Sequence, residues 1–123
     1  MPALFTNPKQ FPTSFMQPGS AEKIHDLGGF DFHLIQVNGP TAYNNTGVFA
    51  TSGIPITPGL FNLRALEWAM PQVANAGYTL VFDPATMNVH VFQSAGAAGP
   101  HAEVANNTNL SAVLFFILGA GVR

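Results

Sequence analysis

From residue 32 onward, short apolar and β-branched runs alternate with turn-forming residues. The run Phe32–Val37 stops at the turn signal 38–40, and the runs Tyr78–Phe82 and Val89–Phe92 flank residues 83–88. Proline directly after aspartate is well placed in a turn and excludes a continuous strand there. The pattern predicts one strand at the first run and a β-hairpin over the other two.

The middle of the chain carries weaker signals. Val48–Ala50 is typical of a short strand, and Ile54–Gly59 indicates a clipped edge segment because its prolines cannot donate ladder hydrogen bonds. We expect a turn or helical loop at Thr57–Asn62 and a strand over about Ala65–Met70, with Pro71 ending any longer helix.

A polar loop, Glu103–Ala112, leads into the apolar run Val113–Leu118 and a closing segment, 119–121. A strand that is apolar on both faces is expected to be covered on both sides. Short strands, Gly/Pro turns and no alternating long helices together predict an all-β fold, a small antiparallel β-sandwich or jelly roll over residues 30–123.

Residues 1–29 differ from the rest in their density of proline and glycine, which excludes a long helix and any central strand. We therefore expect an extended, proline-rich N-terminal arm. The arm also holds large apolar side chains, which disordered tails usually lack. These side chains either fold back onto their own domain or lie along a neighbouring subunit, and the sequence favours neither.

Composition narrows the classes of function. In a chain of 123 residues, which is one domain, only 8% are charged, so we expect other subunits to cover much of the exterior. A net charge of −2 provides no basic surface for nucleic acid. The apolar run near the C-terminus is shorter than the roughly 20 residues of a membrane-spanning helix. The N-terminal residues lack the pattern of a secretory signal, so we expect the protein to stay where it is made.

Candidate chemistry is sparse. The four histidines lie far apart in the sequence, without the spacing of a metal site, and we expect no metal and no cofactor. His33 and His90 fall on predicted strands, so the two side chains could lie close together in the folded protein. A small β-sandwich enzyme that uses one of these histidines therefore stays an open alternative. The carboxylates are scattered and no serine lies in a nucleophile elbow. We therefore expect no catalytic residue and no enzymatic activity.

Three segments carry a resemblance to a known family. The order of Thr51–Thr57, Gly77–Asp83 and Glu103–Asn106, followed by Leu110–Ala112 and Phe116, resembles the small capsid decoration, or cement, proteins of tailed bacteriophages. The similarity covers about residues 32–121. It implies a small β-sandwich or jelly roll on the outside of the phage head, which clamps major-capsid subunits and has no enzymatic activity.

From this resemblance we expect a virion protein that is made in the host cytoplasm and bridges subunits of the major capsid protein. Low charge favours a homo-oligomer, with a trimer slightly preferred over a dimer. Buried aromatic anchors dominate interface energetics, so the expected arm contacts at a protein interface are Phe5, Phe11, Phe15 and Met16. The alternative is a carbohydrate- or host-surface-binding module of the virion, for which Trp68 would be exposed beside polar groups. The structural role predicts instead that Trp68 is buried in the sandwich or at a subunit contact.

Overall fold

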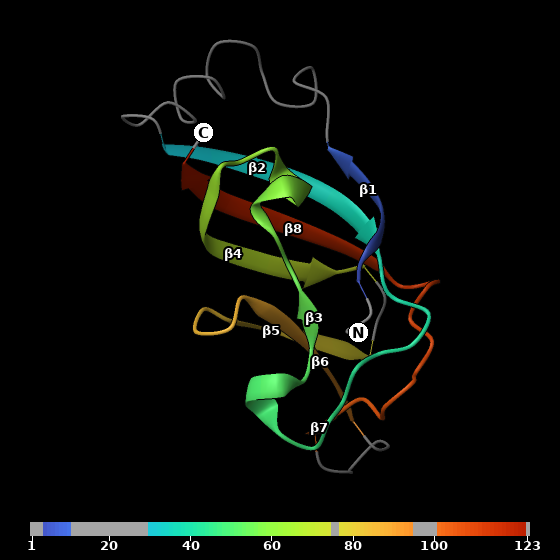
Figure 1. Ribbon diagram of the computed structural model, residues 1–123. Helices are drawn as coiled ribbons and strands as arrows, with labels where there is room; N and C mark the ends of the chain where they lie inside the picture. Colours follow the sequence, from blue (N-terminus) through green and yellow to red (C-terminus); the bar gives the residue numbers. More distant parts are fainter. Residues whose placement is uncertain (1–3, 11–29, 75–76, 95–100, 123) are drawn as a thin grey trace.

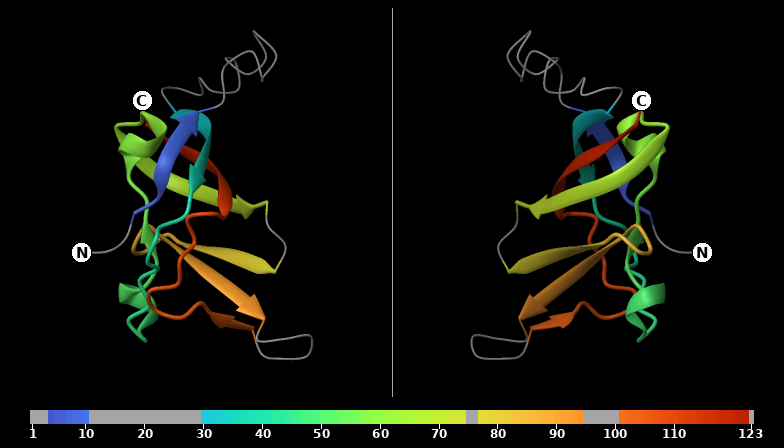
Figure 2. Two further views of the ribbon diagram at one scale, coloured as in Figure 1. Left: turned by 90° about the vertical axis from the view of Figure 1, so that its right-hand side faces the viewer. Right: turned by 90° about the vertical axis from the view of Figure 1, so that its left-hand side faces the viewer.

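The computed structural model describes residues 4–10, 30–74, 77–94 and 101–122, which form two antiparallel β-sheets (Figure 1). The side views in Figure 2 show the sheets as two layers, one above the other. The predicted all-β antiparallel sandwich is confirmed. The jelly-roll form of that sandwich stays a prediction.

Sheet A has the order β1-β2-β8-β4, so the last strand of the chain lies inside the sheet. Its strands are β1 (Thr6–Gln10), β2 (Phe30–Asn38), β8 (Leu114–Val122) and β4 (Ala65–Val73). Strand β2 pairs with β8 along its whole length, and β4 pairs with the other edge of β8. The arrangement leaves β1 and β4 as the edge strands of this sheet.

Sheet B has the order β3-β6-β5, and β7 pairs with the far end of β6. Its strands are β3 (Ile54–Pro55), β6 (Asn88–Ser94), β5 (Tyr78–Asp83) and β7 (His101–Glu103). The predicted hairpin is confirmed as β5 and β6. The side chain of Asp83 closes its turn, because its carboxylate accepts hydrogen bonds from the amide of Ala85 at 3.0 Å and the hydroxyl of Thr86 at 2.8 Å.

The predicted strand at Val48–Ala50 is wrong, because the structure has a 3-10 turn, η1 (Phe49–Thr51), at this place. The amides of Thr51 and Ser52 both donate to the carbonyl of Val48 at 3.1 Å, and the Ser52 hydroxyl donates to the same carbonyl at 2.8 Å. Local bonds of this kind compete with strand pairing, so this short apolar run coils.

The two predictions that follow along the chain are confirmed. The turn expected at Thr57–Asn62 is the 3-10 turn η2 (Pro58–Phe61), and the strand expected from Ala65 is β4. Strand β4 continues through Pro71 to Val73 because it is an edge strand. The amide of Ala74 donates to Leu114 of β8 at 3.1 Å. N–H directions alternate along a strand, so the nitrogen of Pro71 faces the open edge and no ladder bond is lost.

The two faces of β8 differ in burial, although both were expected to be covered. Phe115, Ile117, Gly119 and Gly121 are buried on the inner face, whereas Leu114, Phe116 and Leu118 on the outer face are half-buried. The inner face is dense enough to exclude side chains at its glycines. A methyl group at Gly119 would lie 2.5 Å from the Phe61 ring, which packs over this glycine.

The core lies between the two sheets, and it includes part of the expected arm. Ile35 and Ile117 of sheet A and Val89 and Val91 of sheet B are fully buried in it. Thr6–Gln10 of the arm form the edge strand β1, which pairs with β2. An edge position agrees with the proline content of this segment, because proline is tolerated in edge strands but not in central ones.

Candidate functional site

Strand β4 presents apolar side chains to solvent. Trp68 is 48% exposed and Met70 is 54% exposed. A β-bulge produces this exposure: Leu66 pairs with Gly121 and Trp68 pairs with Ala120, so Glu67 is an extra residue in β4. The bulge breaks the alternation of the strand. We call the exposed face formed by Glu67, Trp68, Met70 and Gln72 the β4 surface.

The indole of Trp68 is held in place by the second sheet. Its ring meets Phe82 of β5 edge-on, with 5.3 Å between the ring centroids and 77° between the planes. Phe82 packs against the core in turn. Edge-to-face contact is a preferred geometry for aromatic pairs, so Trp68 is fixed on one side and open on the other. A large, positioned and half-exposed aromatic ring is the type of side chain that anchors protein interfaces.

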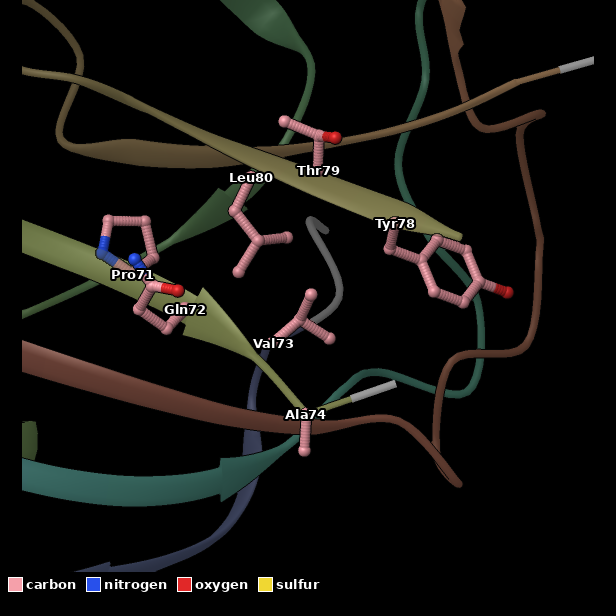
Figure 3. A pocket seen from close by; sticks show the side chains of 7 residues that line it. All are labelled: Pro71, Gln72, Val73, Ala74, Tyr78, Thr79 and Leu80. Carbon is pink, nitrogen blue, oxygen red and sulfur yellow. The ribbon is translucent and has the colours of Figure 1, made fainter. Parts of the chain in front are cut away.

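A pocket of about 420 Å³ lies beside this surface, between the end of β4 and the start of β5. In Figure 3, Val73 and Leu80 point toward the space between the two strands, and Tyr78 lies at its margin. The full lining is Pro71, Gln72, Val73, Ala74, Tyr78, Thr79 and Leu80. This lining has no carboxylate, imidazole or amine, and it combines the phenol of Tyr78 and the amide of Gln72 with apolar side chains. The pocket therefore has room for a partner side chain that is partly apolar and partly polar.

A buried polar cluster lies where the loop after β2 meets β6 and β7. The Tyr43 hydroxyl donates to Oε1 of Glu103 at 2.5 Å, and Nδ1 of His90 donates to the same oxygen at 3.0 Å. The Tyr43 hydroxyl also accepts the amide of Val91 at 3.1 Å. Tyr43 and His90 are both fully buried. The cluster therefore joins the loop after β2 to β6 and β7 through one shared carboxylate.

Burial, together with the hydrogen bond to Glu103, raises the pKa of Tyr43 far above its usual value of 10. The phenol is therefore a neutral donor at all ordinary pH values and is unsuited to proton transfer near neutrality.

Phe49 covers the histidine of this cluster. Its ring stacks on the His90 imidazole, with centroids 3.8 Å apart and planes 12° from parallel. Nε2 of His90 is buried and has no hydrogen-bond partner among the described residues. A proton on Nδ1, shared with the carboxylate of Glu103, leaves Nε2 as the acceptor nitrogen of the imidazole. Nε2 is closed off from solvent in this structure.

The second histidine considered as a candidate, His33, lies on β2 of sheet A, whereas His90 lies on β6 of sheet B. Nε2 of His33 is 3.4 Å from Oδ2 of the buried Asp31. The two histidines have different acidic partners and form separate pairs. Within the described ranges, no group of three His, Asp or Glu side chains is arranged to hold a metal ion.

The expected interface anchors fall in two groups. Phe5 is only 6% exposed and its ring meets Phe115 edge-on, with centroids 5.0 Å apart. This is the position expected if the arm folds back and packs on its own sandwich. Phe11, Phe15 and Met16 lie outside the described residues.

Comparison with known proteins gives no relative for this chain: no family model, no curated protein and no solved structure matches it. Among the described residues, no helix is long and apolar enough to cross a membrane.

Sequence reasoning missed the buried cluster, because its members are far apart in the chain. Tyr43 and Glu103 are separated by 60 positions and meet only after the loops fold together. One signal was available: a single glutamate, Glu103, opens the otherwise uncharged loop Glu103–Ala112. Acidic side chains are rarely buried unless they are paired, but this signal does not identify the partner.

Proposed function

We propose that this protein is a structural component of a virion, which binds the outside of a bacteriophage capsid and bridges subunits of the major capsid protein. The observation that carries the proposal is the β4 surface, a positioned and half-exposed Trp68 beside Met70 on an edge strand. The proposal includes a jelly-roll form of the sandwich and a homo-oligomer on the capsid surface. In this role the protein has no enzymatic activity.

The mechanism is burial of apolar surface between subunits. A rigid sandwich that binds two neighbouring subunits stabilises their association by mass action, because it binds only the assembled state. Repetition over a lattice multiplies a modest contact. Trp68 and Met70 supply the apolar centre of such a contact, and the adjoining pocket between β4 and β5 accepts a side chain from the capsid.

The placement of the titratable groups supports a structural role. The polar cluster around Glu103 is covered by Phe49, and Tyr43 and His90 within it are fully buried. A buried and fully packed cluster fixes the relative positions of loops. This arrangement suits a protein that must hold its shape under load.

The second candidate function is a carbohydrate- or host-surface-binding module of the virion. One observation favours it: Trp68 is half-exposed and has the exposed polar side chains of Glu67 and Gln72 on the same strand. Sugar rings stack on such aromatic faces. Met70, between these residues, adds apolar area that a sugar leaves unused, so the capsid contact is the better match to the whole surface.

Binding to purified capsids tests the proposal. The full chain is mixed with capsids of the source virus that lack it, and bound protein is measured by co-sedimentation. We expect Met70→Asp to abolish binding with unchanged thermal unfolding, because Met70 is 54% exposed and supports little of the fold. Val81→Asp, at another exposed apolar position on β5 that is 39% exposed, is the matched control. If the wild type binds capsids and Met70→Asp binds them equally well, the β4 surface does not make this contact. If the wild type binds a glycan array and Trp68→Ala does not, the result supports the second candidate.

A further inference from the structure

A second exposed apolar site lies at η1, outside the β4 surface. Val48 is 58% exposed and Phe49 is 46% exposed, and Ala50 beside them is also exposed. Figures 1 and 2 show this turn at the end of the molecule away from sheet A, and its Phe49 stacks on His90 of β6. We call residues 46–51 the η1 tip.

Hydrogen bonds hold the η1 tip in one shape. Gly47 has a left-handed φ of 83°, and its amide donates to Oδ1 of Asn45 at 2.9 Å. The amide of Thr46 donates to the Ser52 hydroxyl at 2.9 Å, and the hydroxyl of Thr46 lies 2.5 Å from that of Thr51. A turn fixed in this way loses little conformational entropy when it binds.

The asparagines around the tip are engaged in the protein's own structure. Nδ2 of Asn45 donates to the carbonyl of Val104 at 2.9 Å, and Oδ1 of Asn106 accepts the amide of Asn45 at 3.0 Å. Nδ2 of Asn44 donates to the carbonyl of Thr51 at 2.9 Å. These amides hold two loops together. What the tip offers to a partner is therefore its apolar side chains, and this arrangement favours a protein partner over a sugar.

The two loops that build this end of the molecule carry no charge. Residues 39–53 and 104–113 contain no Asp, Glu, Lys or Arg. In a two-fold contact each group near the axis faces its own copy, so any charge there meets a like charge. A neutral, apolar tip is therefore suited to pairing with itself. The β4 surface differs, because the exposed Glu67 beside Trp68 would repel its copy and suits a different protein.

From these observations we infer that the η1 tip is a self-association surface, at which two copies of this chain pack Val48 and Phe49 against each other about a two-fold axis. This property belongs to the free protein and does not depend on the proposed capsid role. It gives a two-fold pair in place of the trimer expected from composition. A protein with this contact and the β4 surface has two separate binding sites, as a bridging protein needs.

The self-contact is weak. The exposed part of the two loops is smaller than the roughly 20–30 residues that a standard interface uses on each side. We expect a dissociation constant on the order of 100 μM in solution. Copies held side by side on a surface would then pair through their high effective concentration.

Sedimentation velocity of the full chain, from about 5 μM to about 1 mM, tests the inference against the expected affinity. We expect the wild type to shift from monomer to dimer over this range, with little change between low and high salt. Val48→Asp and Val48→Lys each remain monomeric, because like charges face each other across the axis, and an equimolar mixture of the two variants forms the dimer again. Val81→Asp, with its charge on β5, dimerises like the wild type.

Several outcomes overturn the inference. A wild type that is monomeric at every concentration has no such contact. If Val48→Asp still dimerises, the dimer uses another surface. If the equimolar mixture of Val48→Asp and Val48→Lys stays monomeric, a two-fold contact at Val48 is excluded. Circular dichroism and thermal unfolding establish that each variant is folded. The pair Ala50→Glu and Ala50→Lys repeats the charge test at a second exposed position of the same turn. Capsid co-sedimentation is measured separately, so failure of the self-contact leaves the proposed capsid binding standing.

Discussion

Phe5→Ala probes whether the start of the chain belongs to the sandwich or to a partner. Phe5 is 6% exposed and packs edge-on against Phe115. Removing a buried phenylalanine side chain costs about 3–5 kcal/mol, and we expect about 3 kcal/mol here because β1 is an edge strand that relaxes more easily. Against a total stability of about 5–15 kcal/mol this is a large fraction. It corresponds to a fall in melting temperature on the order of 10 °C.

Urea unfolding followed by far-ultraviolet circular dichroism measures the change in the free energy of unfolding. Leu4→Ala is the matched control, because Leu4 is the neighbouring residue and is 56% exposed. This control is expected to change stability by less than about 0.5 kcal/mol. Equal, small effects of both variants would refute the packing of Phe5 in the core. Loss of capsid binding by a Phe5→Ala protein of unchanged stability would instead support its role as an interface anchor.

Four further predictions concern the buried cluster, the inner glycines and the β4 surface. The raised pKa of Tyr43 means that the folded protein keeps the phenol proton at a pH at which the unfolded chain releases it. The contribution of Tyr43 to the free energy of unfolding is therefore complete below about pH 10 and falls above it. Absorbance at 295 nm should show that one of the two tyrosines ionises only on unfolding, and ionisation of both in the folded protein would contradict the burial of Tyr43. Tyr43→Phe, which leaves Glu103 without one donor, should cost about 1–3 kcal/mol in urea unfolding, and a neutral effect would contradict the shared hydrogen bonds. Gly121→Ala should prevent or strongly weaken folding, because the added methyl group would lie 2.0 Å from a backbone oxygen. The control Gly59→Ala should have little effect, because the atom nearest to its methyl group is 3.9 Å away. Similar thermal unfolding of both variants would contradict the packing of β8. Acrylamide should quench Trp68 fluorescence to an intermediate degree, because 48% of this residue is exposed. The quenching should decrease when the protein binds a capsid. An indole that is fully shielded in the free protein would contradict the exposed β4 surface.

Much of the fold follows from local patterns in the sequence. The hairpin of β5 and β6 is predictable because Asp83 both starts the turn and supplies the carboxylate that closes it. The apolar run of β8 is predictable as a strand, although its neighbours in the sheet are not. Local rules also explain the tolerance of Pro71 once β4 is known to be an edge strand.

The errors arise where local and distant interactions compete. Val48–Ala50 has the composition of a strand, but the side chains of Thr46 and Ser52 bond to the backbone of Val48 and hold it as a 3-10 turn. The exposure of Trp68 depends on a bulge in β4, which is decided by pairing with β8. No local pattern encodes that register.

The candidate site is less predictable than the fold. The cluster of Tyr43, His90 and Glu103 forms only when three distant segments pack together. Phe5 was expected as an interface anchor, and the structure places it in the core of its own chain. An apolar side chain in a proline-rich arm fits either position, because the sequence does not record which surface covers it.

Electron cryomicroscopy of source-virus capsids mixed with this protein is the most direct test of the proposed role. Capsids that carry the full chain are compared with bare capsids and with capsids mixed with the Met70→Asp variant. The account predicts ordered β-rich density at repeated positions between capsid subunits, with β4 facing the shell, and its absence for the variant. A capsid surface that stays bare at saturating wild-type protein would contradict the decoration role.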